Sequence, residues 1–167
     1  MAKLPIVTYP HPVLSRVADP VAEITPEISQ FIADMLETMY EGDGVGLAAP
    51  QVNKSLRIIT LDETGPKERK KPMVLVNPVF VTREGQRDSE ESCLSLPTFS
   101  CKLKRYERVA VRGLNEKGEE VEVAGEGLLA IILQHEIDHL DGRTLLDHAS
   151  RLKRTMYETK VKKWRKD

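Results

Sequence analysis

Residues 134–139, with the sequence QHEIDH, constrain this chain more than any other stretch, because the chemistry they indicate works only on a helix. His135 and His139 are four residues apart, so on a helix their imidazoles lie on one face, one turn from each other. Such a pair can bind Zn²⁺ or a similar ion, with Glu136 beside it as a general base. A catalytic metal site also needs a third protein ligand and an open position for water. The sequence therefore predicts a metal-bearing helix and leaves its third ligand to be found.

The helix that carries this motif is expected to be buried. Residues 128–133, with the sequence LLAIIL, are apolar on every side, which is typical of a helix in the interior. Gly142 marks its expected end. A metal site on such a helix would have dry walls and rigid support.

Other local patterns predict further helices and strands. Thr25 as N-cap and Pro26 at the first helical position predict an amphipathic helix that ends near residues 40–42. Apolar or alternating stretches predict strands at residues 56–61, 72–78, 79–83, 109–114 and 120–124, the last two paired as a hairpin. Residues 90–97 read as a tight extended or looped segment, because their side chains are short and Pro97 ends them.

Composition and charge limit the class of protein. At 167 residues, with 40% apolar and 31% charged residues, the chain is expected to form a single domain over residues 1–167. A net charge of −1 gives no overall attraction to nucleic acid or membrane, so neither DNA nor a membrane is an expected partner. No signal peptide or apolar span is recognisable, and we expect a cytoplasmic protein. Cys93 and Cys101 are too few for a disulfide framework.

Residues 149–167 predict a basic terminal helix. Eight Lys or Arg against two acidic residues give this segment a charge of +6, which leaves −7 for the remainder. An imperfect apolar stripe would pack the helix on the body: Leu152, Met156, Val161 and Trp164. The alternative is that its basic face docks on ribosomal RNA.

Three possibilities compete for the third metal ligand. A histidine six residues after His139 would extend the motif to the metzincin protease pattern, but that position holds Leu145, and His148 comes three residues late. Glu158 would suit a thermolysin-like protease by its spacing, although its basic neighbours favour an intrahelical ion pair. Cys93 would supply a thiolate, which binds Zn²⁺ and Fe²⁺ well. From the residues alone, a zinc endopeptidase that uses another third ligand stays open.

Three separated segments together resemble the peptide deformylase family. They are residues 44–51 (GVGLAAPQ), residues 91–95 (ESCLS) and residues 134–139 (QHEIDH), which follow the family patterns GxGxAAxQ, EGCLS and HExxH in the same order. The similarity extends over essentially the whole chain. Two residues depart from the family: Ser92 stands where Gly is usual, and Ser100 stands where many members carry Arg.

This resemblance implies an α+β fold, with small, mostly antiparallel sheets around a buried central helix, an N-terminal amphipathic helix and a basic C-terminal helix. It also implies a reaction, the metal-dependent removal of the N-formyl group from the initiator formyl-methionine of nascent polypeptides, with release of formate. One divalent ion per chain is implied, Fe²⁺ in the cell and Zn²⁺, Ni²⁺ or Co²⁺ in purified protein. A non-catalytic, metal-stabilised ribosome-binding module is a further alternative, and Glu136 argues against it, because a structural site needs no general base.

The resemblance also implies roles for single residues around the metal. The implied metal ligands are Cys93, His135 and His139. Glu136 would take a proton from water and return it to the leaving amine. The Gln51 side chain and the Leu94 backbone N–H would donate hydrogen bonds to the developing oxyanion.

For the substrate, the resemblance implies a cleft beside the metal. Gly46 would let the peptide backbone pass close, and Val45 and Ile132 would line an apolar pocket for the methionine side chain. Glu91 would position the cysteine segment, with Arg105 as its ion-pair partner.

Overall fold

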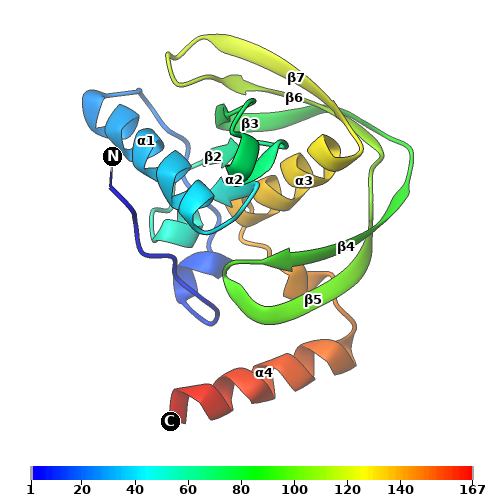
Figure 1. The fold of residues 1–167 in the computed structure, drawn as a ribbon. Helices are drawn as coiled ribbons and strands as arrows, with labels where there is room; N and C mark the ends of the chain where they lie inside the picture. Colours follow the sequence, from blue (N-terminus) through cyan, green and yellow to red (C-terminus); the bar gives the residue numbers. More distant parts are fainter. Residues whose placement is uncertain (1, 167) are drawn as a thin grey trace.

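The motif-bearing segment forms helix α3 (Leu128–Leu140), which lies at the centre of the molecule (Figure 1). The computed structural model describes residues 2–166. Leu133 and Leu140 of α3 are completely buried. The helix stops before Gly142, where φ is +75° and an added Cβ would lie 2.8 Å from the Ser15 carbonyl oxygen. Only glycine fits this turn, so the chain can leave the helix sharply.

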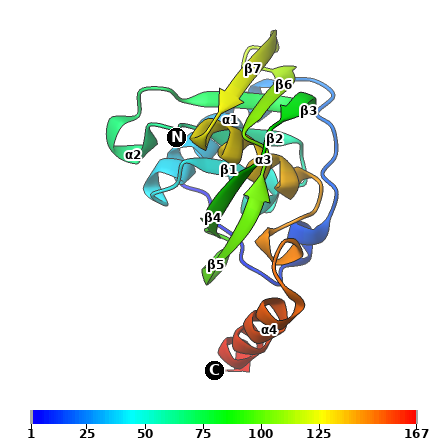
Figure 2. The same ribbon diagram turned by 90° about the vertical axis from the view of Figure 1, so that its right-hand side faces the viewer.

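Two antiparallel sheets enclose α3 (Figures 1 and 2). The larger has five strands in the order β1–β2–β3–β6–β7, and the smaller is the hairpin β4–β5. The strands are β1 (Gly46–Ala48), β2 (Ile58–Leu61), β3 (Met73–Glu84), β4 (Arg87–Cys93), β5 (Leu96–Arg105), β6 (Arg108–Leu114) and β7 (Glu120–Glu126). The predicted α+β class with antiparallel sheets is therefore confirmed.

The larger sheet is covered by helices on both faces. Ile59 of β2 packs in the same apolar cluster as Leu133 of α3. The neighbouring Ile58 packs in the cluster of Met35, which belongs to α1 (Pro26–Glu41). The Thr25 hydroxyl caps α1 by accepting from the Ile28 N–H at 3.2 Å, as the sequence predicts. Four short helices connect these elements: η1 (Pro12–Ser15), η2 (Ala49–Val52), α2 (Gly65–Glu68) and η3 (Leu145–Asp147).

Strand β3 is continuous where the sequence predicts two strands, residues 72–78 and 79–83. Shifts of register against β6 let the chain pass Pro78 without ending the strand. Asn77 adopts a φ of +54°, and its side chain pairs with the Val21 backbone, accepting from N–H at 2.8 Å and donating to C=O at 2.9 Å. The prediction of a break at the proline was wrong, because a bulge absorbs it.

Residues 90–97, expected to be a tight extended or looped segment, are mostly extended strand. β4 ends at Cys93 and β5 begins at Leu96, so only two residues form the turn between them. β5 goes unpredicted, because its inward-facing Phe99 and Cys101 stand between Pro97-Thr98 on one side and the basic residues of 102–105 on the other, which mask the alternation.

The C-terminal helix α4 (Arg151–Lys166) packs on the start of β5 through a different face from the predicted one (Figure 2). Tyr157 and Val161 are buried beside Phe99, and the Tyr157 hydroxyl donates to the Pro97 carbonyl oxygen at 3.0 Å. Three members of the predicted stripe are exposed instead: Leu152 (72%), Met156 (64%) and Trp164 (42%). The fourth member, Val161, is buried as predicted, and the other three were wrong because Tyr157, which anchors the helix, was left out of the stripe.

Candidate metal centre

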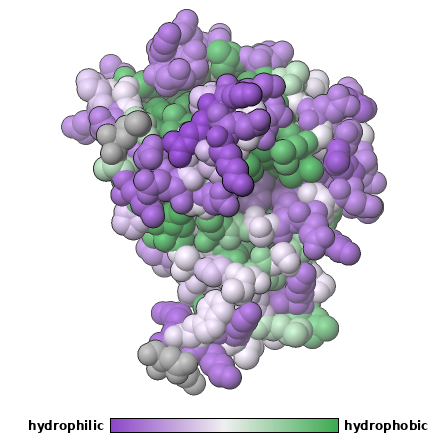
Figure 3. All heavy atoms as spheres, in the orientation of Figure 1, coloured by the Kyte–Doolittle hydropathy of each residue, from purple (hydrophilic) through white to green (hydrophobic). Residues whose placement is uncertain are grey.

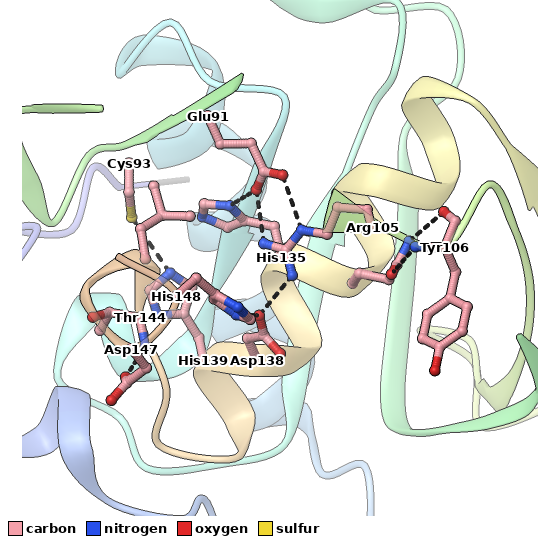
Figure 4. Close-up of polar contacts among 12 residues, drawn as sticks. Glu91, Cys93, Arg105, Tyr106, His135, Asp138, His139, Thr144, Asp147 and His148 are labelled. Atoms are coloured by element: carbon pink, nitrogen blue, oxygen red, sulfur yellow. Dashed lines mark hydrogen bonds and ion pairs between the residues drawn. The ribbon is translucent and has the colours of Figure 1, made fainter. Parts of the chain in front are cut away.

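Cys93, His135 and His139 converge where the end of β4 meets α3 (Figure 4). Their ligand atoms lie within 4.8 Å of one another, and Cys93 Sγ is 3.4 Å from His139 Nε2. A tetrahedral ion bonded to sulfur at about 2.3 Å and to nitrogen at about 2.1 Å would hold those two atoms about 3.6 Å apart. The three side chains therefore fit one ion. Within residues 2–166 they form the one cluster of this composition.

The fold brings these ligands together from two directions. On α3 the two imidazoles lie one helical turn apart, with ring centroids separated by 5.3 Å. On the hairpin, pairing jumps from Ser92↔Ser100 to Cys93↔Leu96. Such a shift re-aims the side chain beside it, and here it accompanies the turn of the cysteine toward the helix.

Glu91 orients His135. Its Oε1 accepts from His135 Nδ1 at 2.9 Å, so the other ring nitrogen, Nε2, keeps its lone pair for an ion. Arg105 donates two hydrogen bonds to the same carboxylate, from Nη2 to Oε1 at 2.7 Å and from Nε to Oε2 at 2.9 Å. Burial alone would raise the pKa of Glu91, but these hydrogen bonds outweigh it and lower the pKa to about 2. The carboxylate is thus always ionised near neutral pH.

The surroundings of Cys93 favour a thiolate. Burial would raise the pKa of the thiol, but the neighbouring imidazoles of His139 and His135 outweigh it and lower the pKa to about 5. A thiolate is the form of cysteine that binds a metal ion. The Cys93 side chain therefore has the properties of a metal ligand.

Glu136 is buried against the glycine loop of residues 44–46. Burial raises the pKa of its carboxyl group, a shift that is common in groups that act as general acid and base. Its Oε1 has no hydrogen-bond partner in the part of the chain that the structure describes. A Cβ on Gly46 would lie 2.6 Å from Glu136 Oε2. The glycine therefore makes room for the carboxylate of Glu136, a constraint that the sequence did not reveal.

Gly46→Ala is expected to displace the Glu136 carboxylate and to lower kcat by about 10²-fold, the usual cost of misplacing a reacting group by about 1 Å. Metal content should stay at the wild-type level, because no ligand moves. Gly44→Ala is the matched control, since an added Cβ there meets its nearest atom, Leu94 Cδ1, at 3.4 Å. Steady-state kinetics with formyl-Met-Ala measure the effect; equal rates for both variants would contradict the proposed contact.

Gln51 reaches the same place from η2. Its Oε1 accepts from the Ala48 N–H at 3.0 Å, which fixes which end of the amide points toward the cysteine. Its Nε2 lies 3.5 Å from Cys93 Sγ and 3.2 Å from Ser95 Oγ. Leu94 lies in the turn between β4 and β5. The structure thus brings the amide donor of Gln51, from η2, beside Cys93 and next to the turn that carries Leu94.

A cleft of about 960 Å³ opens over these residues. All the residues predicted to contact substrate line it, namely Gly46, Val45 and Ile132. The region around Leu96, also expected to contribute, lines the cleft as well, and two apolar side chains of α3 that were not predicted add to its walls: Leu128 and Ile131. Leu128, at the start of α3, is 51% exposed and borders the open cleft.

Ser92, which replaces the usual glycine, also lines the cleft. Its backbone is not among the non-glycine residues with positive φ, and its side chain is exposed opposite Ser100. A serine is therefore accommodated there without backbone strain.

The competing ligands lie elsewhere. Glu158 pairs with Arg154 at 3.1 Å along α4, and His148 Nε2 lies 2.9 Å from Asp138 Oδ2. Neither belongs to the metal-ligand cluster. Cys101 is buried, with its Sγ 3.8 Å from the Leu145 carbonyl oxygen, so it is a core side chain.

Comparison with known proteins agrees with this geometry. The sequence model of the family described as polypeptide deformylase matches residues 3–155. A peptide deformylase of Thermodesulfovibrio yellowstonii is 49% identical over 163 residues, which cover 97% of this chain and 98% of that protein. One from Neisseria meningitidis is 46% identical over 166 residues, covering 99% and 98%. A crystal structure of a peptide deformylase from Legionella pneumophila superposes with a TM-score of 0.92 at 41% identity, covering 99% of this chain and 96% of that one.

Proposed function

This chain belongs to the polypeptide deformylase family, the hydrolases that remove the N-formyl group from nascent polypeptides, and we propose that Cys93, His135 and His139 hold its catalytic metal ion. The observation that carries the proposal is the convergence of three suitable ligand atoms beside the buried carboxylate of Glu136. A divalent ion held by these residues would supply Lewis acidity and lower the pKa of a water molecule beside it.

The chain's own residues then move the protons and hold the substrate. Glu136 takes the proton of the attacking water and later delivers it to the amine that leaves the formyl carbon. Gln51 Nε2 and the Leu94 N–H donate to the formyl oxygen as negative charge develops on it. Val45, Ile132 and the cleft walls around them receive the methionine side chain.

We propose Fe²⁺ as the ion in the cell, with Zn²⁺, Ni²⁺ or Co²⁺ also suited to one thiolate and two imidazoles. Anaerobically purified protein is expected to hold one iron per chain and to release formate from formyl-Met-Ala. Exposure to air should abolish most of this activity as the iron is oxidised. Metal analysis with a formate assay before and after exposure is the measurement; full activity in air with one zinc per chain would overturn the iron assignment.

We further propose that α4 docks on the ribosome in the cytoplasm, where nascent chains are made. Its buried face carries Tyr157 and Val161. Arg154 bonds to Glu158, and Lys160 to Thr98. The exposed Lys162 and Lys163, with the exposed Leu152 and Met156, are accessible to a partner. Figure 3 shows hydrophilic and hydrophobic residues side by side over α4. Basic residues next to apolar ones suit a surface of phosphates and protein. Within residues 2–166, no helix has both the length and the hydropathy needed to cross a membrane.

Reversing charge on the exposed face of α4, with Lys162→Glu and Lys163→Glu together, is expected to weaken ribosome binding by about tenfold or more, because phosphate contacts dominate such affinities. Hydrolysis of formyl-Met-Ala should not change. Lys67→Glu with Lys70→Glu, also exposed but beside α2, is the control. Cosedimentation with ribosomes at several salt concentrations measures binding; salt-insensitive or equal binding by both double variants would refute docking through α4.

A further inference from the structure

The chain of charged contacts around the metal centre does not end at Arg105. Its Nη1 donates to Asp138 Oδ2 at 2.8 Å, and His148 Nε2 lies 2.9 Å from the same oxygen (Figure 4). Exposure rises along the series, from 4% for the Arg105 side chain to 21% for Asp138 and 29% for His148. A continuous path of short polar contacts therefore runs from His135 through Glu91 to the protein surface.

Two carboxylates from different elements fix the plane of the Arg105 guanidinium. Glu91 on β4 accepts hydrogen bonds from Nε and Nη2, and Asp138 on α3 accepts one from Nη1. A guanidinium is flat and rigid, so a change in the Asp138 bond tilts the two donors that face Glu91. The backbone next to Arg105 is held separately: Gln134 bonds both the N–H and the C=O of Tyr106 at 2.9 Å. Loss of the Asp138 bond would thus reorient the guanidinium and leave the strand in place.

His148 is the last residue of this path, at the protein surface, where it contacts Asp138. A carboxylate only accepts hydrogen bonds, so His148 Nε2 carries the hydrogen and donates this bond to Asp138 Oδ2. The histidine follows η3, where Thr144 and Asp147 cap each other, with Thr144 N–H to Asp147 Oδ2 at 2.8 Å. Beyond it lies a second cavity of about 360 Å³, lined by Arg105, Asp138 and His148 and separate in its lining from the substrate cleft. Without His148, water in this cavity would compete with Arg105 for Asp138.

We propose that Asp138 and His148 are positioning residues for the metal centre, which hold Arg105 so that Glu91 keeps His135 in its ligating orientation. They do so from behind α3, without lining the cleft that takes the substrate. The inference rests on the proposed metal site. Partners that orient a ligating histidine typically change metal affinity or activity by about 10–100-fold when they are lost.

The test measures metal release, which a purely structural role would leave unchanged. Co²⁺-loaded wild type, Asp138→Asn, His148→Ala and His148→Gln are mixed with excess chelator, and the loss of the cobalt–thiolate absorption is followed. Asp138→Asn is expected to release metal about 10–100-fold faster and His148→Ala about 3–10-fold faster. His148→Gln places an amide N–H near the position of Nε2 and should return to within about twofold of wild type.

His11→Ala is the control for loss of a histidine, since His11 Nδ1 accepts from the Val13 N–H within its own loop. Urea unfolding of the metal-free variants separates stability from metal binding. Variants that are less stable but show wild-type release rates and cobalt spectra would overturn the proposal. Failure of wild-type protein to release formate would count against the proposed function alone, because the release rates are measured without substrate.

Discussion

Glu136→Gln is expected to lower kcat/KM for formyl-Met-Ala by about 10²–10⁴-fold, the range that a positioned acid–base group contributes. Glutamine keeps the shape of the side chain but cannot accept the proton of the attacking water. The effect should fall mainly on kcat, because Glu136 acts on the reacting atoms and not on the methionine side chain. Formate release under saturating substrate is the measurement.

Metal content shows whether a lower rate in Glu136→Gln comes from the lost carboxylate or from a lost metal ion. Glu136 is not among the three ligands, so the variant should bind metal like the wild type. A variant with full metal content and an unchanged rate would remove Glu136 from the mechanism. Gly46→Ala should lower kcat less than Glu136→Gln does, and likewise leave metal content unchanged, because both substitutions act on the Glu136 carboxylate.

Cys93→Ala is expected to lose the tightly bound metal and, with it, at least about 10³-fold in activity. The ion contributes several kcal/mol to the transition state, and each ~1.4 kcal/mol is a factor of ten. Two histidines alone leave an incomplete site, and the cavity left by Sγ offers no other donor within the cluster. Metal analysis after gel filtration, together with the formate assay, measures both losses.

Cys101→Ala is the matched control, since this second cysteine is buried away from the cluster. It should keep its metal and its rate. Retained metal and activity in Cys93→Ala would instead require a different third ligand and would revive the endopeptidase interpretation with Glu158 or His148.

Local signals explain which elements could be predicted. The cap at Thr25 and the apolar spacing that follows predict α1, because a helix is stabilised by contacts within a few residues. The hairpin of β6 and β7 was predicted from alternation around a short turn, and both strands are present. β3 was divided into two predicted strands, because the irregular pairing at Asn77 forms only against a neighbouring strand. β5 was missed, because the mixed polar residues around Cys101 form a strand only through pairing with β4. The packed face of α4 likewise depends on Phe99, far away in the chain.

The sequence by itself determined the chemistry available to this protein. The spacing of His135 and His139 needs only helical geometry, and the order of the three motifs is enough to indicate the family. Local spacing left the third ligand open, because Cys93 and His139 are 46 residues apart and nothing local joins them, and only the family resemblance pointed to Cys93.

Only the tertiary structure decided which groups meet at the helix that carries QHEIDH. It places the Cys93 sulfur 3.4 Å from His139, packs Gly46 against Glu136, and joins Glu91 to His148 through Arg105 and Asp138. These contacts link strands to the helix across long stretches of chain. Their energy depends on distance and burial in the folded protein, which no pattern of neighbouring residues records.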